Sequence, residues 1–154
     1  MTDTRTADAL VVGSELAGPV RVTTMERIHW YEGGMRSAAT GVRTLPHSNI
    51  HTDEEYARSQ GLSAPIADGM MSTNWLSSML VQYFGMEYVA HGELRTKFIK
   101  PIFLGAVVSV RGRVTSVERA GSGGTLYGME VWCEDEKGVK LTVGDAKAEV
   151  APRP

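Results

Sequence analysis

Cysteine is nearly absent from this chain, since Cys133 is the single one among 154 residues. One cysteine excludes an internal disulfide and a metal cage built from thiolates, and it is typical of proteins from a reducing compartment. Apolar runs long enough to cross a bilayer are also missing, and the segment from Met1 to Asp8 is polar. We therefore expect no membrane span, no secretory signal and a cytoplasmic location.

An excess of one charge sign is lacking too. The chain has 16 Lys and Arg against 18 Asp and Glu, and its basic residues occur singly or in pairs. Neither nucleic acid nor an anionic membrane is therefore expected as the main partner. The 42% hydrophobic content is that of an ordinary globular protein. We expect a single domain over residues 1–154, with residues 1–17 as a tail and an entry strand.

The first half of the chain carries helix signals. Thr23-Thr24-Met25-Glu26 resembles a capping box and predicts a short helix that stops at Gly33-Gly34. Residues 35–50 lack periodicity and predict a loop. Thr52-Asp53-Glu54-Glu55 is a second capping box, and its helix is expected to end near Gly61.

A longer helix is predicted from Gly69 to Phe84, closed by Gly85. Its apolar residues recur at helical spacing and predict a broad buried face. They are Met70, Met71, Trp75, Leu76, Met79, Leu80 and Phe84.

Beyond this helix the apolar residues alternate with polar ones, which is typical of strands. Strands are predicted over 93–100, 107–117, 125–134 and 139–150, with hairpin turns between the last three. Helices followed by neighbouring strands predict an α+β fold, in which one antiparallel sheet wraps around the long helix.

The segment from His51 to Gly112 resembles the MaoC-like branch of the hotdog fold, which includes (R)-specific enoyl-CoA hydratases and related acyl dehydratases. The residues that match the family's motif are Ile50, His51, Asp53, Ala57, Pro65, Ile66, Gly69 and Met70. The stretch from Lys97 to Gly105 is similar to the family's basic and aromatic strand before a glycine turn. The resemblance implies a hotdog domain that binds an acyl thioester of CoA or of a carrier protein. It also implies a homodimer or a higher homo-oligomer, and we expect no cofactor.

The chain departs from the family motif at catalytic positions. The family's aspartate falls on Pro46, its Asn-Pro pair on Ser48-Asn49, and its histidine before the helix glycine on Asp68. Proline has neither a group for proton transfer nor an N–H. Three alternatives remain open. A slip of the chain brings His47 or Asn49 to the water, Asp68 replaces the carboxylate, or the pocket has lost hydration.

Three residues are the main catalytic candidates. His51 is either the proton-transfer residue or a polar residue at a helix start. Asp68 either caps the long helix or acts on His51 and the water. The N–H of Gly69 either holds the thioester carbonyl oxygen, or the glycine only allows close packing of the helix.

Weaker candidates border the same expected pocket. Ser77 matches a pocket serine of some relatives, Met70 tolerates variable acyl chains, and His47 lies four residues before His51. Because both histidines fall in a proline-containing loop, we expect no metal site.

Two functions of different class follow. The first is a hydro-lyase in which His51 transfers the proton, Gly69 N–H holds the carbonyl oxygen, and Asp68, Ser48 or Asn49 positions the water. The second is a non-catalytic hotdog subunit or acyl-binding module. A cyclase or thioesterase in the same pocket is a variant of the first, and the acyl group remains open.

Overall fold

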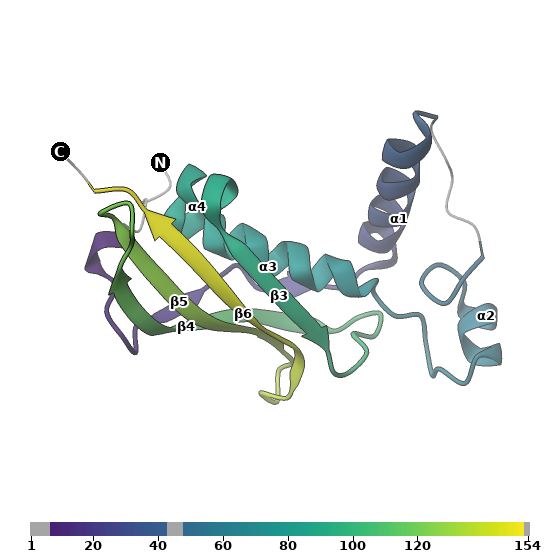
Figure 1. The fold of residues 1–154 in the computed structure, drawn as a ribbon. Helices are drawn as coiled ribbons and strands as arrows, with labels where there is room; N and C mark the ends of the chain where they lie inside the picture. Colours follow the sequence, from purple (N-terminus) through teal and green to yellow (C-terminus); the bar gives the residue numbers. More distant parts are fainter. Residues whose placement is uncertain (1–6, 43–47, 153–154) are drawn as a thin grey trace.

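The fold is an antiparallel sheet that packs against one long helix (Figure 1). The structure is a computed structural model, and it describes residues 7–42 and 48–152. The helices are α1 (Met25–Thr40), α2 (Glu54–Ser59), α3 (Gly69–Phe84) and α4 (Met86–His91), after a short 3-10 helix at Ala7–Ala9. The strands are β1 (Glu15–Ala17), β2 (Arg21–Val22), β3 (Glu93–Phe98), β4 (Val107–Arg119), β5 (Thr125–Glu134) and β6 (Lys140–Val150). The strand order is β1-β4-β5-β6-β3, and β2 pairs with β4. This arrangement confirms the predicted α+β class.

The three long strands bury alternate side chains against the helix. Val108, Val110 and Val114 of β4 are almost fully buried, and β5 and β6 continue the same layer. The exposed residues between them include Arg111 and Arg113, which form ion pairs with glutamates on the outer face of the sheet. The residues that alternate along the sequence therefore face the core and the solvent in turn.

The helix α3 lies close to the sheet because small residues face it. Met79 is fully buried, and a Cβ added at Gly18 or Gly112 would stand 3.1 or 3.2 Å from its side chain. Met71 is buried as expected, whereas Trp75 is only partly buried. Both ends of the helix agree with the prediction, and Gly85 ends it with a φ of 61°, a conformation that suits glycine.

A polar contact also ties α3 to the sheet. The Ser72 hydroxyl lies 2.9 Å from the Thr142 hydroxyl of β6 and donates to the Gly69 carbonyl at 2.7 Å. Ser72 and Thr142 are both buried. Their hydroxyls satisfy each other where water is excluded, so the pair fixes the N-terminal turn of α3 against the sheet.

One prediction about the helices was wrong, and one helix was not predicted. The helix α1 does not stop at Gly33-Gly34 but continues to Thr40, so the expected loop begins later. A glycine inside a helix costs only about 1 kcal/mol, which the helix-forming residues on either side offset. The helix α4 between α3 and β3 was not predicted at all. At the N-terminus of α1, the Thr24 hydroxyl accepts the Arg27 N–H at 3.3 Å, so Thr24 is the capping residue.

The sheet ends in β3, an edge strand with mostly exposed residues. The helices α1 and α2 both lie beyond the sheet, at the end of the molecule where α3 begins (Figure 1). Within the described residues, no helix is both long and apolar enough to cross a membrane.

Candidate active site

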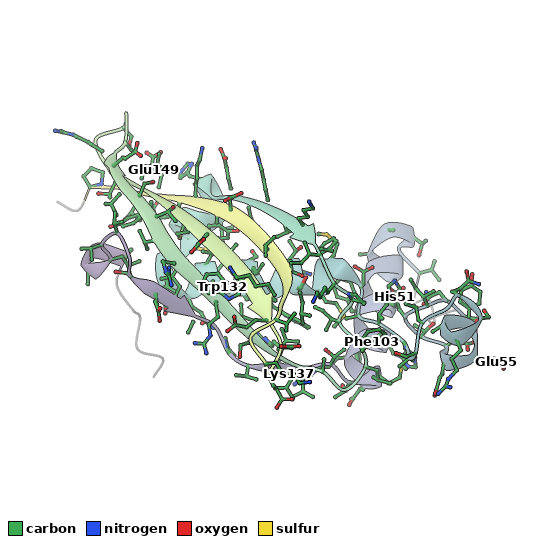
Figure 2. All side chains as sticks on the ribbon, turned by 90° about the horizontal axis from the view of Figure 1, so that it is seen from below. His51, Glu55, Phe103, Trp132, Lys137 and Glu149 are labelled. Atoms are coloured by element: carbon green, nitrogen blue, oxygen red, sulfur yellow. The ribbon has the colours of Figure 1, made fainter. Side chains whose placement is uncertain are left out.

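A tight turn before α2 presents His51. The Asn49 side-chain oxygen accepts the backbone N–H of His51 at 2.7 Å and that of Thr52 at 3.0 Å. Such an arrangement replaces the missing backbone partners of a turn, and asparagine is suited to it. Figure 2 shows His51 beside α1, at the end of the molecule away from Glu149. The side-chain oxygen of Asn49 therefore has a local structural role.

The neighbouring Ser48 is also engaged in local structure. Its hydroxyl donates to the carboxylate of Asp53, which caps α2 by accepting the Tyr56 N–H at 2.9 Å. These two hydrogen bonds, the one from Ser48 above all, lower the pKa of Asp53. The capping residue of α2 is therefore Asp53, one residue beyond the threonine that opens the predicted box.

The ring of His51 is held in one orientation. Its Nδ1 lies 2.8 Å from the carbonyl oxygen of Ile66, which can only accept a hydrogen bond. In the neutral ring the proton therefore sits on Nδ1, and Nε2 carries the lone pair. The Ile66 carbonyl is fixed in turn, because Ile66 pairs with Phe103 and the Ala67 N–H donates to Ile102 at 2.8 Å.

Asp68 and Gly69 form the N-terminus of α3. The Asp68 carboxylate accepts the Met70 N–H at 2.7 Å, so Asp68 is the helix cap. The Gly69 N–H has no hydrogen-bond partner within the described part of the chain. It is one of the free donors at a helix N-terminus, where the helix dipole also favours negative charge. The exposed ring of Phe98 lies over this glycine, with three ring carbons within 3.0 Å of the position that a Cβ would take.

A carboxylate from α1 completes the cluster. One oxygen of Glu32, a ring nitrogen of His51 and one oxygen of Asp68 all lie within 4.8 Å of one another, and all three residues are partly buried. Glu32 forms no hydrogen bond or ion pair with any described residue. The structure thus places a second carboxylate beside His51, from a part of the chain that the motif does not include.

Tyr31 stands next to this cluster. Burial first, and then the nearby negative charges of Asp68 and Glu32, raise the pKa of the Tyr31 hydroxyl, while the Asn74 side chain opposes the shift. Tyr31 therefore keeps its proton at neutral pH and is a neutral hydrogen-bond donor beside two carboxylates.

Two hollows flank the cluster. One of about 340 Å³ is bordered by His51 and Gly69 together with Phe98 and Lys100. The other, of about 500 Å³, lies between α1 and α3 and is lined by Glu26, Arg27, Trp30, Tyr31, Met71, Asn74 and Trp75. His51 and Gly69 therefore border a common space large enough for part of a small ligand.

The remaining predicted site residues lie elsewhere. Met70 is 46% exposed on the first turn of α3, away from the buried face of that helix. Ser77 lies further along α3 and interacts with Tyr88, whose pKa is raised by burial despite that contact. His47 and Pro46 lie outside the described residues.

Glu32 and Tyr31 were missed by the sequence analysis. The sequence predicts a helix that stops at Gly33-Gly34, so both residues fall at its expected end. The available signal was Ile28, which is fully buried and lies four residues before Glu32. Residues four apart share a helix face, so Glu32 is on the face that packs inward.

A known family model covers the segment that holds His51 and Gly69. The family model described as MaoC like domain matches residues 43–126, which is more than half of the chain. The chain belongs to the MaoC-like domain family. Among curated proteins, none has a sequence that matches this MaoC-like chain.

Solved structures with the same fold are numerous but distant in sequence. The MaoC-like dehydratase from Rhodospirillum rubrum has a TM-score of 0.73 at 18% identity, over 96% of this chain and 97% of that one. The R-hydratase PhaJ1 from Pseudomonas aeruginosa has a TM-score of 0.68 at 19% identity, over 98% of this chain and 94% of that one. A chain of the HadBC 3R-hydroxyacyl-ACP dehydratase complex from Mycobacterium tuberculosis has a TM-score of 0.67 at 17% identity, over 92% of this chain and 98% of that one. Together they establish the hotdog fold of this MaoC-like chain.

Proposed function

We propose that this MaoC-like protein is a hydro-lyase that adds water to, or removes it from, the α,β position of an acyl thioester of CoA or of a carrier protein. The observation that carries the proposal is the shared hollow of His51 and Gly69. One residue offers a basic nitrogen and the other a free N–H, as addition to a conjugated thioester requires. A cytoplasmic location is part of the proposal.

The two groups have separate tasks in this reaction. The thioester carbonyl oxygen accepts the Gly69 N–H, and the dipole of α3 stabilises the negative charge that develops there. The Nε2 atom of His51 takes a proton from water while the water oxygen bonds to the β-carbon. The imidazolium then returns that proton to the α-carbon, so that one water molecule is added in total. Dehydration runs through the same steps in reverse.

The entrance to the hollow favours a phosphate-bearing thioester. Lys100 borders the hollow, and Lys97 lies three residues earlier, near the end of β3. Ammonium groups at this position suit the phosphates of CoA or of a carrier-protein arm. Met70 and Ser77 of α3 and His47 remain proposed contacts of the acyl part.

The edge strand β3 supports an assembly of at least two subunits. An open edge presents unpaired backbone groups, and proteins usually cover or pair such edges. Exposed Phe98 and Ile99 at the end of β3 add apolar surface to this edge. We propose a homodimer with a continuous sheet and the site near the subunit interface. A stable monomer at micromolar concentration in light scattering would contradict it.

Turnover of a panel of acyl thioesters tests the function. The purified protein is incubated with enoyl-CoA and 3-hydroxyacyl-CoA esters of short, medium and bulky acyl groups, and the absorbance of the conjugated thioester is followed. Hydration or dehydration of at least one member is expected. Binding of acyl-CoA by calorimetry without any turnover would refute the hydro-lyase.

That last outcome would support the second candidate, a non-catalytic hotdog subunit or acyl-binding module. The observation in its favour is Pro46 at the position of the family aspartate. Two relatives from Mycobacterium tuberculosis, the ChsH1-ChsH2 and HadBC complexes, were solved as assemblies of two different chains. A partner of that kind would carry the reaction. Release of free acid or of a lactone in the same assay would identify a thioesterase or a cyclase.

A further inference from the structure

A carboxylate from outside the motif lies beside His51. We propose that Glu32 of α1 holds the attacking water beside His51 and takes the part for which Pro46 has no group. This inference rests on the proposed function and assigns a water-positioning residue to it. Glu32 lies outside the matched residues 43–126, so nothing in the family match selects it.

The spacing between the groups fits one shared water. The Glu32 oxygen and the His51 ring nitrogen lie within 4.8 Å of each other and form no direct ion pair. Two groups that bind one water, each at about 2.8 Å with a near-tetrahedral angle between them, stand about 4.6 Å apart. Because Nδ1 is engaged by the Ile66 carbonyl, Nε2 is the ring nitrogen left to bind the water. The cluster therefore has the dimensions of a water site.

Glu32 suits this task better than Asp68, the other carboxylate of the cluster. Asp68 caps α3 through the Met70 N–H at 2.7 Å, and rotation of its carboxylate would break that bond. Glu32 has no hydrogen bond or ion pair with any described residue. A partly buried carboxylate with no partner among the described residues is a suitable acceptor for a water molecule, since a carboxylate without any hydrogen-bond donor is costly to bury.

The position of Glu32 is fixed by its helix rather than by a loop. Ile28 lies one turn earlier on the same face and is fully buried. The helix continues beyond Gly33-Gly34 to Thr40, so Glu32 is in the middle of α1 and not at a frayed end. The backbone of a regular helix therefore sets the position from which the Glu32 side chain extends.

In the proposed step, Glu32 accepts one hydrogen of the water while His51 Nε2 accepts the other. As the water oxygen bonds to the β-carbon, His51 takes its proton and becomes an imidazolium. The Glu32 carboxylate stabilises that charge and does not itself take the proton. The imidazolium then gives the proton to the α-carbon, which restores neutral His51 and leaves Glu32 unchanged.

The experiment compares Glu32→Gln and Glu32→Ala with the wild type on the thioester panel. Glu26→Ala is the matched control, because Glu26 is an exposed carboxylate on the first turn of the same helix. Both Glu32 variants should lower kcat at least about 100-fold with little change in KM, as expected for a group that acts on the water and not on the thioester. Glu26→Ala should stay within about threefold of the wild type.

Chemical rescue separates this role from a structural one. Formate or propionate should restore part of the turnover of Glu32→Ala in a saturable way, because a small carboxylate fills the vacated space. It should not accelerate the wild type, Glu32→Gln or Glu26→Ala. Full activity of either Glu32 variant, with an active wild type, would overturn the inference and leave the hydro-lyase standing.

A crystal structure tests the inference even if no thioester is turned over. At high resolution, one ordered water should lie within hydrogen-bond distance of both the Glu32 carboxylate and His51 Nε2, and it should be lost or displaced in Glu32→Ala. A direct Glu32–His51 ion pair, or an unrelated orientation of Glu32, would refute the water-holding role. Absence of turnover with the water in place would refute the hydro-lyase alone.

Discussion

Replacement of Gly69 by alanine tests the proposed oxygen donor and its packing together. A Cβ at this position would stand 2.7, 2.8 and 2.9 Å from three ring carbons of Phe98. Carbon atoms in ordinary contact are about 3.5 Å apart or more, so the ring must move by roughly 0.8 Å. Phe98 is 48% exposed at the end of an edge strand, which leaves the ring room to turn towards solvent.

The stability change should therefore be small. Forced movement of an exposed ring costs about 1 kcal/mol, at the low end of overpacking. Alanine in place of glycine in a helix offsets up to about 1 kcal/mol of that cost. Gly69→Ala should thus change the free energy of unfolding by less than about 1 kcal/mol. In a Phe98→Ala background the contact is gone, and the same substitution should stabilise the protein by about 0.5 kcal/mol.

The effect on turnover should be much larger than the effect on stability. The methyl group crowds the approach of the carbonyl oxygen to the Gly69 N–H, so kcat/KM should fall about 100-fold. It should fall by a similar factor in the Phe98→Ala background, since the methyl remains. Urea unfolding at one fixed protein concentration and turnover of the best thioester measure the two effects. Turnover within threefold of the wild type would refute the Gly69 N–H as the oxygen donor. If Gly69→Ala changed the free energy of unfolding equally in the wild type and in the Phe98→Ala background, the ring contact would be refuted.

Other substitutions test the neighbouring groups. His51→Asn should keep the fold by circular dichroism and lower kcat by about 10²–10⁴-fold, and unchanged kcat would exclude His51 from proton transfer. Asp68→Ser should keep the melting temperature within a few degrees, because serine also caps helices, and should reduce turnover far less than Glu32→Gln. Ser72→Ala leaves the buried Thr142 hydroxyl without its partner and should lower the free energy of unfolding by about 1–3 kcal/mol, a loss that an additional Thr142→Val should partly reverse. Burial raises the pKa of the Cys133 thiol to about 12, so Cys133 should resist thiol reagents at pH 8 until the protein is unfolded. The contribution of the protonated thiol to the free energy of unfolding should be complete below pH 9 and should decline as the pH rises towards 12. Rapid labelling of the native protein would contradict its burial.

The sequence by itself determined the elements whose signals are local. The alternation of valines in β4 and the helical spacing in α3 state which side chains face the core, because the period of the backbone fixes the face. Asp68 and Gly85 mark the ends of α3, since the first offers a side-chain acceptor to a free N–H and the second adopts a positive φ. The motif around His51 was likewise enough to predict the fold of the family.

The tertiary structure alone decided which groups meet. The continuation of α1 beyond Gly33-Gly34 was seen only in the structure, because two glycines weaken the local helix signal without ending the helix. Glu32 reaches His51 only because α1 packs beside the N-terminus of α3, and the tautomer of His51 follows from a carbonyl 15 residues further along the chain. Such contacts join residues from separate elements. Their distances follow from the packing of the whole domain, which no local pattern in the sequence encodes.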